Sequence, residues 1–470
     1  MVCFVSFSAT SAAETSFPGV LKQHHANRRY FADPAGDIVY LTGSHTWCNL
    51  QDMGKTDPPE PFDYDAYLDF LIAHNHNFMR LWRWEFVKSD MGSGIIYSEP
   101  QPWIRKGPGN ALDGKAKFDL ERFNQAYFDR LRSRVIAAGN RGIYVSIMFF
   151  EGWGLHGSKE PWCWDGHPFN KDNNVNGIDG DPDSNGRGLE INMLAVASVT
   201  AIQEAYVKKV IETVNDLDNV LYEIVNESGD YSTEWQYHFI GFIKDYESKK
   251  PKQHPVGMTF QYNYYKTQLG KNETLFSSPA DWISPHFIGG WRDNPPDDLR
   301  DKVVLSDTDH LWGIGGNRVW VWISFCRGLN PIFMDRYGYI TPVEGKPKPK
   351  WVDYVKPKPD SDPEFDTVRQ SLGFTRSYAQ RMDLENSIPR RDLASTSFCL
   401  ANMGIEYLIY APEGGEFTVD LNGAPGSFST EWMNPESGEK TSGAAVKGNG
   451  IREFTAPFTG DAVLYLKAVR

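Results

Sequence analysis

The segment "VLYEIVNESGD" (residues 220–230) has the composition of a buried strand that ends on an amide and a carboxylate. Residues 220–225 are apolar apart from Glu223, which is typical of a strand covered on both faces. Asn226 and Glu227 follow directly, and residues 228–230 then turn the chain. Such strands belong to parallel sheets, whose carboxyl ends gather polar groups at one edge. We therefore expect Asn226 and Glu227 at a functional edge, and Glu223 as the structural partner of a neighbouring positive group.

Similar apolar runs alternate with helical periodicity along most of the chain. For example, "FNQAYFDRLRSRVIAAGNRG" (residues 123–142) has apolar residues at helical steps and precedes the strand-like "IYVSIMF". A doubly wound sheet would need a glycine-rich phosphate loop after an early strand, and none is present. The pattern therefore predicts a (β/α)8 TIM barrel over residues 20–390. Its eight strand candidates lie near residues 38–42, 78–82, 143–149, 220–225, 255–260, 282–287, 302–306 and 331–334.

The pattern changes near residue 390. Short alternating runs such as "EYLIYA", "EFTVDL" and "AVLYLKA" replace the helical periodicity, with Gly, Pro, Asn and Asp between them. This predicts a small antiparallel β-sandwich over residues 391–470, which we expect to brace the barrel. The Pro- and Lys-rich segment 341–363 is interpreted as a long loop after the eighth strand.

Composition excludes several classes of function. The formal net charge of −13 disfavours nucleic acid and anionic membranes as partners. No run of 18 apolar residues is present, so no membrane span is predicted. The five cysteines contain no CxxC pair, which argues against a zinc site or a redox pair. The start, "MVCFVSFSATSAAE", is similar to the end of a signal peptide without its basic region, and we expect a secreted or periplasmic protein.

Aromatic residues are numerous: 15 Trp, 22 Tyr and 28 Phe. Many of them belong in the core, but tryptophan-lined clefts also stack on the apolar faces of sugar rings. A carbohydrate substrate is the expected partner. The sequence does not indicate the oligomeric state.

Polar and aromatic side chains follow each predicted barrel strand. In TIM barrels the chemistry takes place at these carboxyl ends of the strands. A ring of such groups at eight separate strand ends favours a catalytic mouth, because burying isolated polar groups is costly. The candidate substrate-binding residues are His45, Trp47, Arg80, Trp82, Glu151, Trp153, Asn226, Gln261, His286, Asp309, His310, Trp312 and Asp335.

Two carboxylates are the candidates for catalysis. Glu227 and Asp307 follow strands four and seven, whose ends face each other across an eight-stranded barrel. Paired carboxyl groups cleave glycosidic bonds: one protonates the leaving oxygen, and the other attacks or stabilises the developing oxocarbenium centre. Asp309 is two residues beyond Asp307 and is the rival for the second role.

These motifs resemble a known superfamily. "EIVNESGD" is similar to the strand-four motif of the retaining (β/α)8 glycoside hydrolases, in which the glutamate is the acid/base. "YFADPAGDIVYLTGSHTW", "NFMRLWRWE" and "HPFNKDNNVNGI" are more narrowly similar to the apiosidase-like catalytic domain, and the C-terminal region resembles its companion collagen-binding-type β-sandwich. The resemblance covers nearly the whole chain. It implies a strand-seven nucleophile and an Asn226 that binds a sugar 2-hydroxyl.

One departure leaves the mechanism open. The superfamily has glutamate on strand seven, whereas this chain has the shorter Asp307. Retention through a glycosyl-enzyme with Asp307 as nucleophile is the first expectation, followed by the same mechanism with Asp309. Inversion with one of the two aspartates as base is the third. The expected substrate is a plant-type or microbial polysaccharide or oligosaccharide, and the alternative from another class is a catalytically silent carbohydrate-binding protein.

No cofactor is expected for catalysis. The sequence "DPDSNG" places Asp181, Asp183 and Asn185 at the spacing of the first half of a calcium loop. Asn192 occupies the position of the usual bidentate glutamate. These three residues are therefore a candidate site for a structural calcium. Asp307, Asp309 and His310 could also suggest a metal, but sugar contacts are the expected role there, because no other His/Asp cluster of ligand spacing accompanies them.

Overall fold

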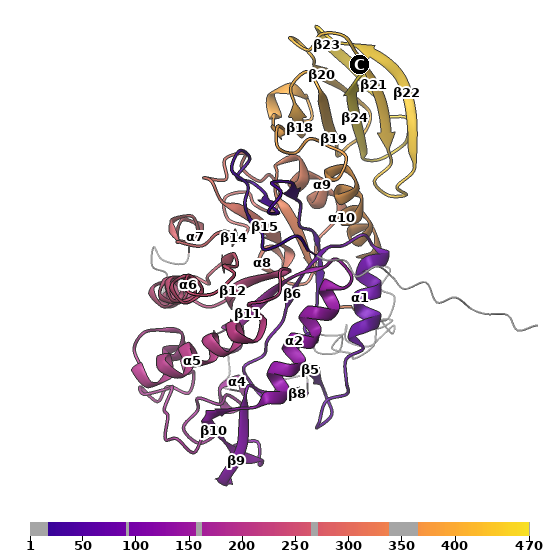
Figure 1. The fold of residues 1–470 in the computed structure, drawn as a ribbon. Helices are drawn as coiled ribbons and strands as arrows, with labels where there is room; N and C mark the ends of the chain where they lie inside the picture. The colour runs from indigo at the N-terminus through magenta and orange to yellow at the C-terminus, as the bar shows by residue number, and fades with distance from the viewer. Residues whose placement is uncertain (1–16, 91–93, 157–161, 265–270, 338–364, 470) are drawn as a thin grey trace, which may run out of the picture.

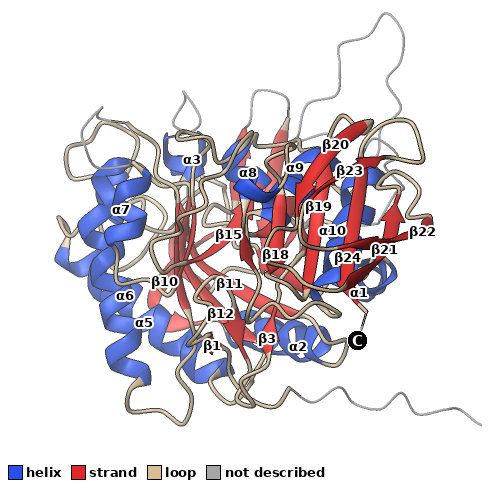
Figure 2. Cartoon of the chain, turned by 90° about the horizontal axis from the view of Figure 1, so that it is seen from above, coloured by secondary structure: helices blue, strands red, loops and turns tan. Residues whose placement is uncertain are grey.

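Eight parallel strands form the centre of the molecule (Figures 1 and 2). The structure is a computed structural model that describes residues 17–90, 94–156, 162–264, 271–337 and 365–469. The strands follow one another around the barrel in the order β4-β16-β15-β14-β13-β12-β11-β6. This confirms the predicted TIM barrel. The strands are β4 (Gly43–His45), β6 (Phe78–Leu81), β11 (Tyr144–Glu151), β12 (Val220–Asn226), β13 (Val256–Thr259), β14 (Trp282–Ser284), β15 (Val303–Asp307) and β16 (Asn330–Met334).

Thr42 and Asn77 join the first and last strands of this order. The Asn77 backbone N–H donates to the Thr42 carbonyl at 3.0 Å, and the Asn77 side-chain oxygen accepts from the Thr42 N–H at 3.0 Å. These two residues directly precede β4 and β6. The Asn77 side chain thus supplies an acceptor where the backbone hydrogen bonds between β4 and β6 are few. These bonds close the barrel at the amino-terminal ends of its strands.

Helices surround the barrel on its outer face (Figure 2). Their buried side chains repeat at steps of three and four, as in Val199, Tyr206 and Val210 of α5. The connection between β14 and β15 contains no helix in its described residues 285–302. The helices are α1 (Tyr64–Ala73), α2 (Gln125–Gly139), α3 (Trp153–His156), α4 (Trp162–Asp165), α5 (Ala197–Val214), α6 (Thr233–Glu247), α7 (Asn272–Ser277), α8 (Thr308–Leu311), α9 (Arg318–Cys326) and α10 (Asp366–Ala379).

The first barrel strand lies later than residues 38–42, where the sequence analysis placed it. Ile38–Val39 is β3, which pairs antiparallel with β2 (Phe31–Ala32), and β1 (Lys22–Gln23) completes a three-stranded sheet. The run was assigned to the barrel because its residues are apolar. In the structure Ile38 and Val39 are half-buried. Leu41 packs with Phe31 in a separate cluster against the amino ends of the barrel strands.

Antiparallel hairpins extend the loops after the first barrel strands. The strands β5, β7 and β8 form one small sheet, and β9 pairs with β10 as a long ribbon at the lower end of Figure 1. The sequence analysis did not predict these hairpins. Their bounds are β5 (Asp52–Gly54), β7 (Lys88–Asp90), β8 (Ile95–Glu99), β9 (Trp103–Asn110) and β10 (Ala116–Phe123).

The C-terminal region is a two-layer antiparallel domain. Its larger sheet has the order β17-β18-β19-β24-β21-β22, and β20 pairs with β23 in the second layer. A core that includes Phe417, Phe428 and Trp432 lies between the layers. The strands are β17 (Ile388–Pro389), β18 (Cys399–Asn402), β19 (Glu406–Ala411), β20 (Glu416–Asp420), β21 (Ser427–Met433), β22 (Lys440–Lys447), β23 (Ile451–Thr455) and β24 (Ala462–Ala468).

This C-terminal domain packs directly on α9 and α10 of the barrel (Figure 1). Trp322 of α9 stacks on Tyr410 of β19, with 6.1 Å between the ring centroids. Arg318, also on α9, donates to Asp461 at 2.9 Å, and the Tyr410 hydroxyl donates to the same carboxylate at 2.8 Å. The apolar contact and the shared carboxylate fix the domain against the outside of the barrel.

Some sequence predictions concern residues outside the described ranges. These are the loop assigned to 341–363 and the signal-like segment 1–14. Four of the five cysteines lie in the described part, and all four are buried free thiols. None of the helices of the described chain combines the length and the apolar character that a membrane crossing requires.

Gly257 of β13 tests the packing of the barrel. A β-carbon at this position would lie 1.9 Å from the buried ring of Trp282. We expect Gly257→Ala to destabilise the fold by about 1–3 kcal/mol through overpacking, measured as a lower midpoint of thermal unfolding. Gly241→Ala on α6 is the control, because its β-carbon would have no neighbour within 4 Å and alanine favours a helix. Equal midpoints for the two variants would contradict the packing described here.

Candidate active site

A cavity of about 520 Å³ lies at the carboxyl ends of the barrel strands. It contains the two acidic side chains Glu227 and Asp309, the amide of Asn226, and the imidazoles of His286 and His310. The remaining lining is largely aromatic. Of the residues predicted to form the site, the structure brings together in this cavity Trp47, Trp82, Trp153, Asn226, Glu227, His286, Asp309, His310 and Trp312.

Glu227 is held at the cavity by an unusual backbone conformation. It directly follows β12 and has a φ of 47°, in the left-handed region that non-glycine residues rarely adopt. The neighbouring strand end approaches very closely, since a β-carbon on Gly152 would lie 2.5 Å from the Ser228 α-carbon. The Gly152 N–H donates to the Asn226 carbonyl at 2.8 Å. Glycine at 152 therefore permits the turn that directs Glu227 into the cavity.

Arg80, at the end of β6, connects the acidic strand ends beneath the cavity. Its Nε and Nη2 donate to the two carboxylate oxygens of Glu223, at 2.8 and 2.5 Å. Nη2 also donates to the Asn226 side-chain oxygen at 2.6 Å. Nη1 donates to Asp307 at 2.9 Å and to Asp309 at 3.1 Å. The planar guanidinium thus fixes side chains from β12 and β15 together, and Glu223 pairs with a positive group as the sequence suggested.

Asp307 and Asp309 have different environments although they are two residues apart. Asp307 has no exposed surface and does not line the cavity. His45 Nε2 lies 2.9 Å from its Oδ2, and the Asp309 backbone N–H donates to its Oδ1 at 3.0 Å. Asp309 is in the first turn of α8, and its carboxylate lines the cavity with 10% of the side chain exposed. Asp309 is therefore the aspartate of this pair that shares the cavity with Glu227.

The ionisation of the two aspartates is shifted in opposite directions. Burial opposes charge on Asp307, but His45 and Arg80 outweigh it and hold the pKa of this carboxyl below its usual range. Burial raises the pKa of Asp309 to about 6, with Arg80 acting against the shift and Asp307 adding to it.

Glu227 is surrounded by groups that favour its protonated form. Burial raises the pKa of Glu227 well above its usual value, and the negative charges of Asp309 and Glu151 raise it further. Burial also raises the pKa of Glu151, to about 8, although the Gly154 and Trp153 N–H groups donate to this carboxylate at 3.0 and 2.7 Å. Glu227, which favours its protonated form, therefore provides an acid beside the second carboxyl group, Asp309, in one cavity.

The two histidines that line the cavity, His286 and His310, contribute neutral rings. Burial lowers the pKa of His286 to about 4, and burial together with Arg80 lowers the pKa of His310 well below its usual value. His310 Nδ1 lies 2.7 Å from the Ser284 hydroxyl. His45 lies beneath the cavity and stacks on Trp82, with 5.8 Å between the ring centroids. Neutral imidazoles can exchange hydrogen bonds with hydroxyl groups.

Two side-chain amides hold the aromatic wall. The backbone N–H of Trp82 donates to the side-chain oxygen of Asn49 at 2.7 Å, and the backbone N–H of Trp84 donates to the side-chain oxygen of Gln51 at 2.6 Å. The Trp84 indole N–H donates to the Trp47 carbonyl at 3.0 Å. These three tryptophans therefore have fixed positions along the cavity.

Five predicted substrate-binding residues do not line this cavity: His45 and Arg80, described above, and Glu151, Gln261 and Asp335. Gln261 does not line this cavity, and its side-chain oxygen accepts from the hydroxyls of Thr233 and Thr274. Asp335 is fully buried and accepts two hydrogen bonds of 2.7 Å from Arg369. Glu151 is likewise outside the lining and accepts from backbone N–H groups. Asp335 and Glu151 therefore satisfy neighbouring parts of the fold, whereas Gln261 lines a second, adjoining cavity that shares Tyr262 and His286 with the first.

The cavity also contains residues that the sequence analysis did not assign to binding. Tyr262 follows the fifth barrel strand, so its position at a strand end is a detectable signal, as it is for the stacking candidate Trp84 after the second strand. Phe287 and Arg292 come from the loop after β14, and the guanidinium of Arg292 lies 5.4 Å from the Phe287 ring. The conformation of a helix-free loop leaves no periodic signal in the sequence. The full set of unassigned lining residues is Phe260, Tyr262, Phe287, Arg292, Leu311, Gly313 and Ile314.

Comparisons with known proteins concern the two parts of the chain separately. Residues 387–467 match the family described as "Putative collagen-binding domain of a collagenase". The chain is similar in structure to a glycoside hydrolase family 5 protein from Bacteroides vulgatus ATCC 8482, at 14% identity and a TM-score of 0.60, over 97% of this chain and 95% of that one. It is also similar to a protein named as a glycoside hydrolase, at 13% identity and a TM-score of 0.57, over 97% and 98% of the two chains. No curated protein matches the sequence significantly. At these identities the structural likeness establishes the fold.

Arg80 tests the electrostatic arrangement beneath the cavity. We expect Arg80→Met to destabilise the protein by about 3–5 kcal/mol, because it leaves Glu223 and Asp307 buried without a full counter-charge. The loss should be larger at pH 8 than at pH 5, since unpaired buried carboxyls have raised pKa values and lose stability as they ionise. Thermal unfolding at the two pH values measures both effects.

Two further variants separate charge from packing. Arg80→Met combined with Glu223→Gln should recover part of the loss at pH 8, because one buried charge is removed. Arg132→Met is the control, since its ion pair with Asp216 is exposed at the surface and is expected to contribute less than about 1 kcal/mol. A loss for Arg80→Met that is independent of pH and unchanged by Glu223→Gln would contradict the electrostatic explanation.

Proposed function

We propose that this protein is a glycoside hydrolase that cleaves O-glycosidic bonds of a plant-type or microbial polysaccharide or oligosaccharide. The observation that carries the proposal is the joint presence of Glu227 and Asp309 in one aromatic-walled cavity at the mouth of the barrel. Carboxyl pairs of this kind are the machinery of glycoside hydrolysis. The fold shared with a glycoside hydrolase family 5 protein is consistent with this activity.

Glu227 is proposed as the general acid and base. Its buried position and acidic neighbours favour the protonated form, which can donate to the oxygen of the leaving group. Asn226 and His310 lie beside it in the cavity and offer hydrogen bonds to sugar hydroxyls. The tryptophans of the wall offer apolar faces to the sugar ring.

Asp309 is proposed as the second catalytic carboxylate, in preference to Asp307. A nucleophile must reach the anomeric carbon, and Asp309 borders the cavity whereas Asp307 is covered by His45 and Arg80. Asp307 is then the positioning residue that keeps Arg80 in place. We propose retention through a glycosyl-enzyme formed on Asp309. Inversion, with Asp309 activating a water molecule, is the alternative for the same carboxylates.

The proposed location is secreted or periplasmic. The apolar and then small residues of "MVCFVSFSATSAAE" support it. An apiosidase-like specificity remains part of the proposal through the sequence motifs quoted above. The open, largely aromatic cavity is compatible with a polysaccharide or an oligosaccharide.

Glu227→Gln tests the activity itself. On a panel of plant and microbial polysaccharides, we expect wild type to release sugars and Glu227→Gln to be at least about 100-fold slower, because the variant cannot donate the proton. Glycan binding by the variant should be retained. Glu234→Gln, an exposed change in the first turn of α6, should keep wild-type rates. If wild type and Glu227→Gln both bind glycan and neither hydrolyses it, the protein is a carbohydrate-binding protein and the proposal fails.

Asp309→Ala and Asp307→Ala distinguish the two aspartates. In a retaining enzyme, a small anion such as azide can replace a deleted nucleophile. We expect azide to restore activity and form a glycosyl azide with Asp309→Ala, and to have no effect on Asp307→Ala.

The acid limb of kcat/KM should lie near pH 6 in wild type, because activity rises as Asp309 ionises.

NMR of the first-formed anomer reports stereochemistry directly. Retention is the expected outcome. If azide restores activity to Asp307→Ala and not to Asp309→Ala, the nucleophile is Asp307 instead of Asp309. An inverted product would exclude the glycosyl-enzyme.

A further inference from the structure

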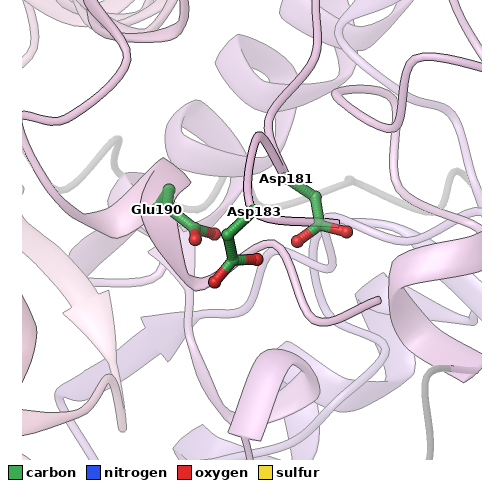
Figure 3. A group of neighbouring side chains, drawn as sticks. All are labelled: Asp181, Asp183 and Glu190. Carbon is green, nitrogen blue, oxygen red and sulfur yellow. The ribbon is translucent and has the colours of Figure 1, made fainter. Parts of the chain in front are cut away.

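A second acidic cluster lies outside the cavity, in the long connection between β11 and β12. Carboxylate oxygens of Asp181, Asp183 and Glu190 all lie within 4.8 Å of one another. Figure 3 shows the three side chains next to each other, with Asp183 between the other two. Glu190 belongs to the short 3-10 helix Leu189–Asn192. The sequence analysis had placed Asn185 in this set, but the Asn185 amide donates to Asp183 at 2.8 Å.

Asp181 is the member that points to a ligand. Its side chain is buried, with 8% exposed. One carboxylate oxygen accepts from the Gly186 N–H at 2.9 Å, whereas the other has no hydrogen-bond partner and no exposed surface. A buried carboxylate oxygen without a partner is costly, and a bound cation would remove that cost.

The negative charge of the cluster lacks a protein counter-ion in the described part of the chain. Two cationic side chains of the same connection have other partners: Lys171 pairs with Asp179, and Arg187 donates to the Tyr264 hydroxyl at 2.7 Å. A buried oxygen of Glu190 also has no hydrogen-bond partner. Burial and the adjacent charge of Asp183 raise the pKa of Glu190.

We propose that Asp181, Asp183 and Glu190 form a structural calcium site. Ca²⁺ prefers carboxylate and carbonyl oxygens at about 2.4 Å, so any two of its ligands lie at most about 4.8 Å apart. The three carboxylates meet this limit without rearrangement. The site differs from the calcium loop suggested by the sequence, since Glu190 supplies the third carboxylate. Asn192, at the position of the usual bidentate ligand, accepts from the Ser228 hydroxyl instead, at 3.3 Å.

The position of the site gives the cation a structural role. The 3-10 helix that carries Glu190 also carries Asn192, which contacts Ser228, the residue after Glu227. The Gln203 amide of α5 donates to the Ile191 carbonyl at 2.8 Å. A cation at the cluster therefore anchors the segment that supports the turn of Glu227.

Calorimetric titration of the EDTA-treated and dialysed full chain with CaCl2 tests the site. We expect one Ca²⁺ per chain with a Kd of about 10⁻⁵–10⁻³ M, and a higher thermal midpoint in 10 mM CaCl2. Asp183→Asn and Glu190→Gln should each weaken binding at least about tenfold and abolish the shift of the midpoint. Asp183 is exposed, so its variant is expected to fold.

Asp172→Asn is the matched control. It removes the same charge from an exposed position in the same connection, and it should bind Ca²⁺ as wild type does. Absence of both heat and thermal shift with wild type overturns the proposal. So does binding that is equally strong in Asp183→Asn and Glu190→Gln. Neither readout depends on hydrolysis, so the outcome is independent of the proposed function.

Discussion

The geometry of the candidate active site depends on the hydrogen bonds of one buried group, the guanidinium of Arg80. It joins Glu223 and Asn226 of β12 to Asp307 of β15, and it also contacts Asp309. A lysine would supply one charge without the planar set of donors that reaches several strand ends at once. Because the group is buried, each contact is strong and each lost partner is costly. The floor of the cavity is thus a single hydrogen-bonded network, and Glu227 and Asp309 stand above it.

This network divides the carboxylates into two groups. Glu223 and Asp307 neutralise Arg80 and remain covered, whereas Glu227 and Asp309 face the cavity. The division follows from the number of donors that reach each group. The Asp307 carboxylate is within hydrogen-bond distance of His45, Arg80 and a backbone N–H, and its pKa falls. Glu227 is buried among negative charges, and its pKa rises. Similar side chains therefore acquire opposite pKa shifts by position alone.

The support of this site extends well beyond the strand ends. Asn49 and Gln51 hold the backbone of Trp82 and Trp84, and the close approach of Gly152 to Ser228 directs Glu227 inward. The C-terminal domain contacts α9 and α10 on the outside of the barrel, away from the cavity lining. Its position is consistent with a bracing role.

The sequence alone determined the barrel, because buried parallel strands and amphipathic helices leave periodic patterns that are local in the chain. It also determined Asn226 and Glu227, since a polar pair after an apolar strand lies at the carboxyl edge. The sequence analysis placed the first barrel strand too early, because the apolar character of residues 38–42 does not reveal which sheet they belong to. Only the tertiary structure decided between Asp307 and Asp309 at the cavity, and between Asn185 and Glu190 in the acidic cluster. Access to Asp307 depends on His45 and Arg80, which are more than 200 residues away. In the acidic cluster, the folding of the connection brings Glu190 to Asp183, while the Asn185 amide donates to Asp183.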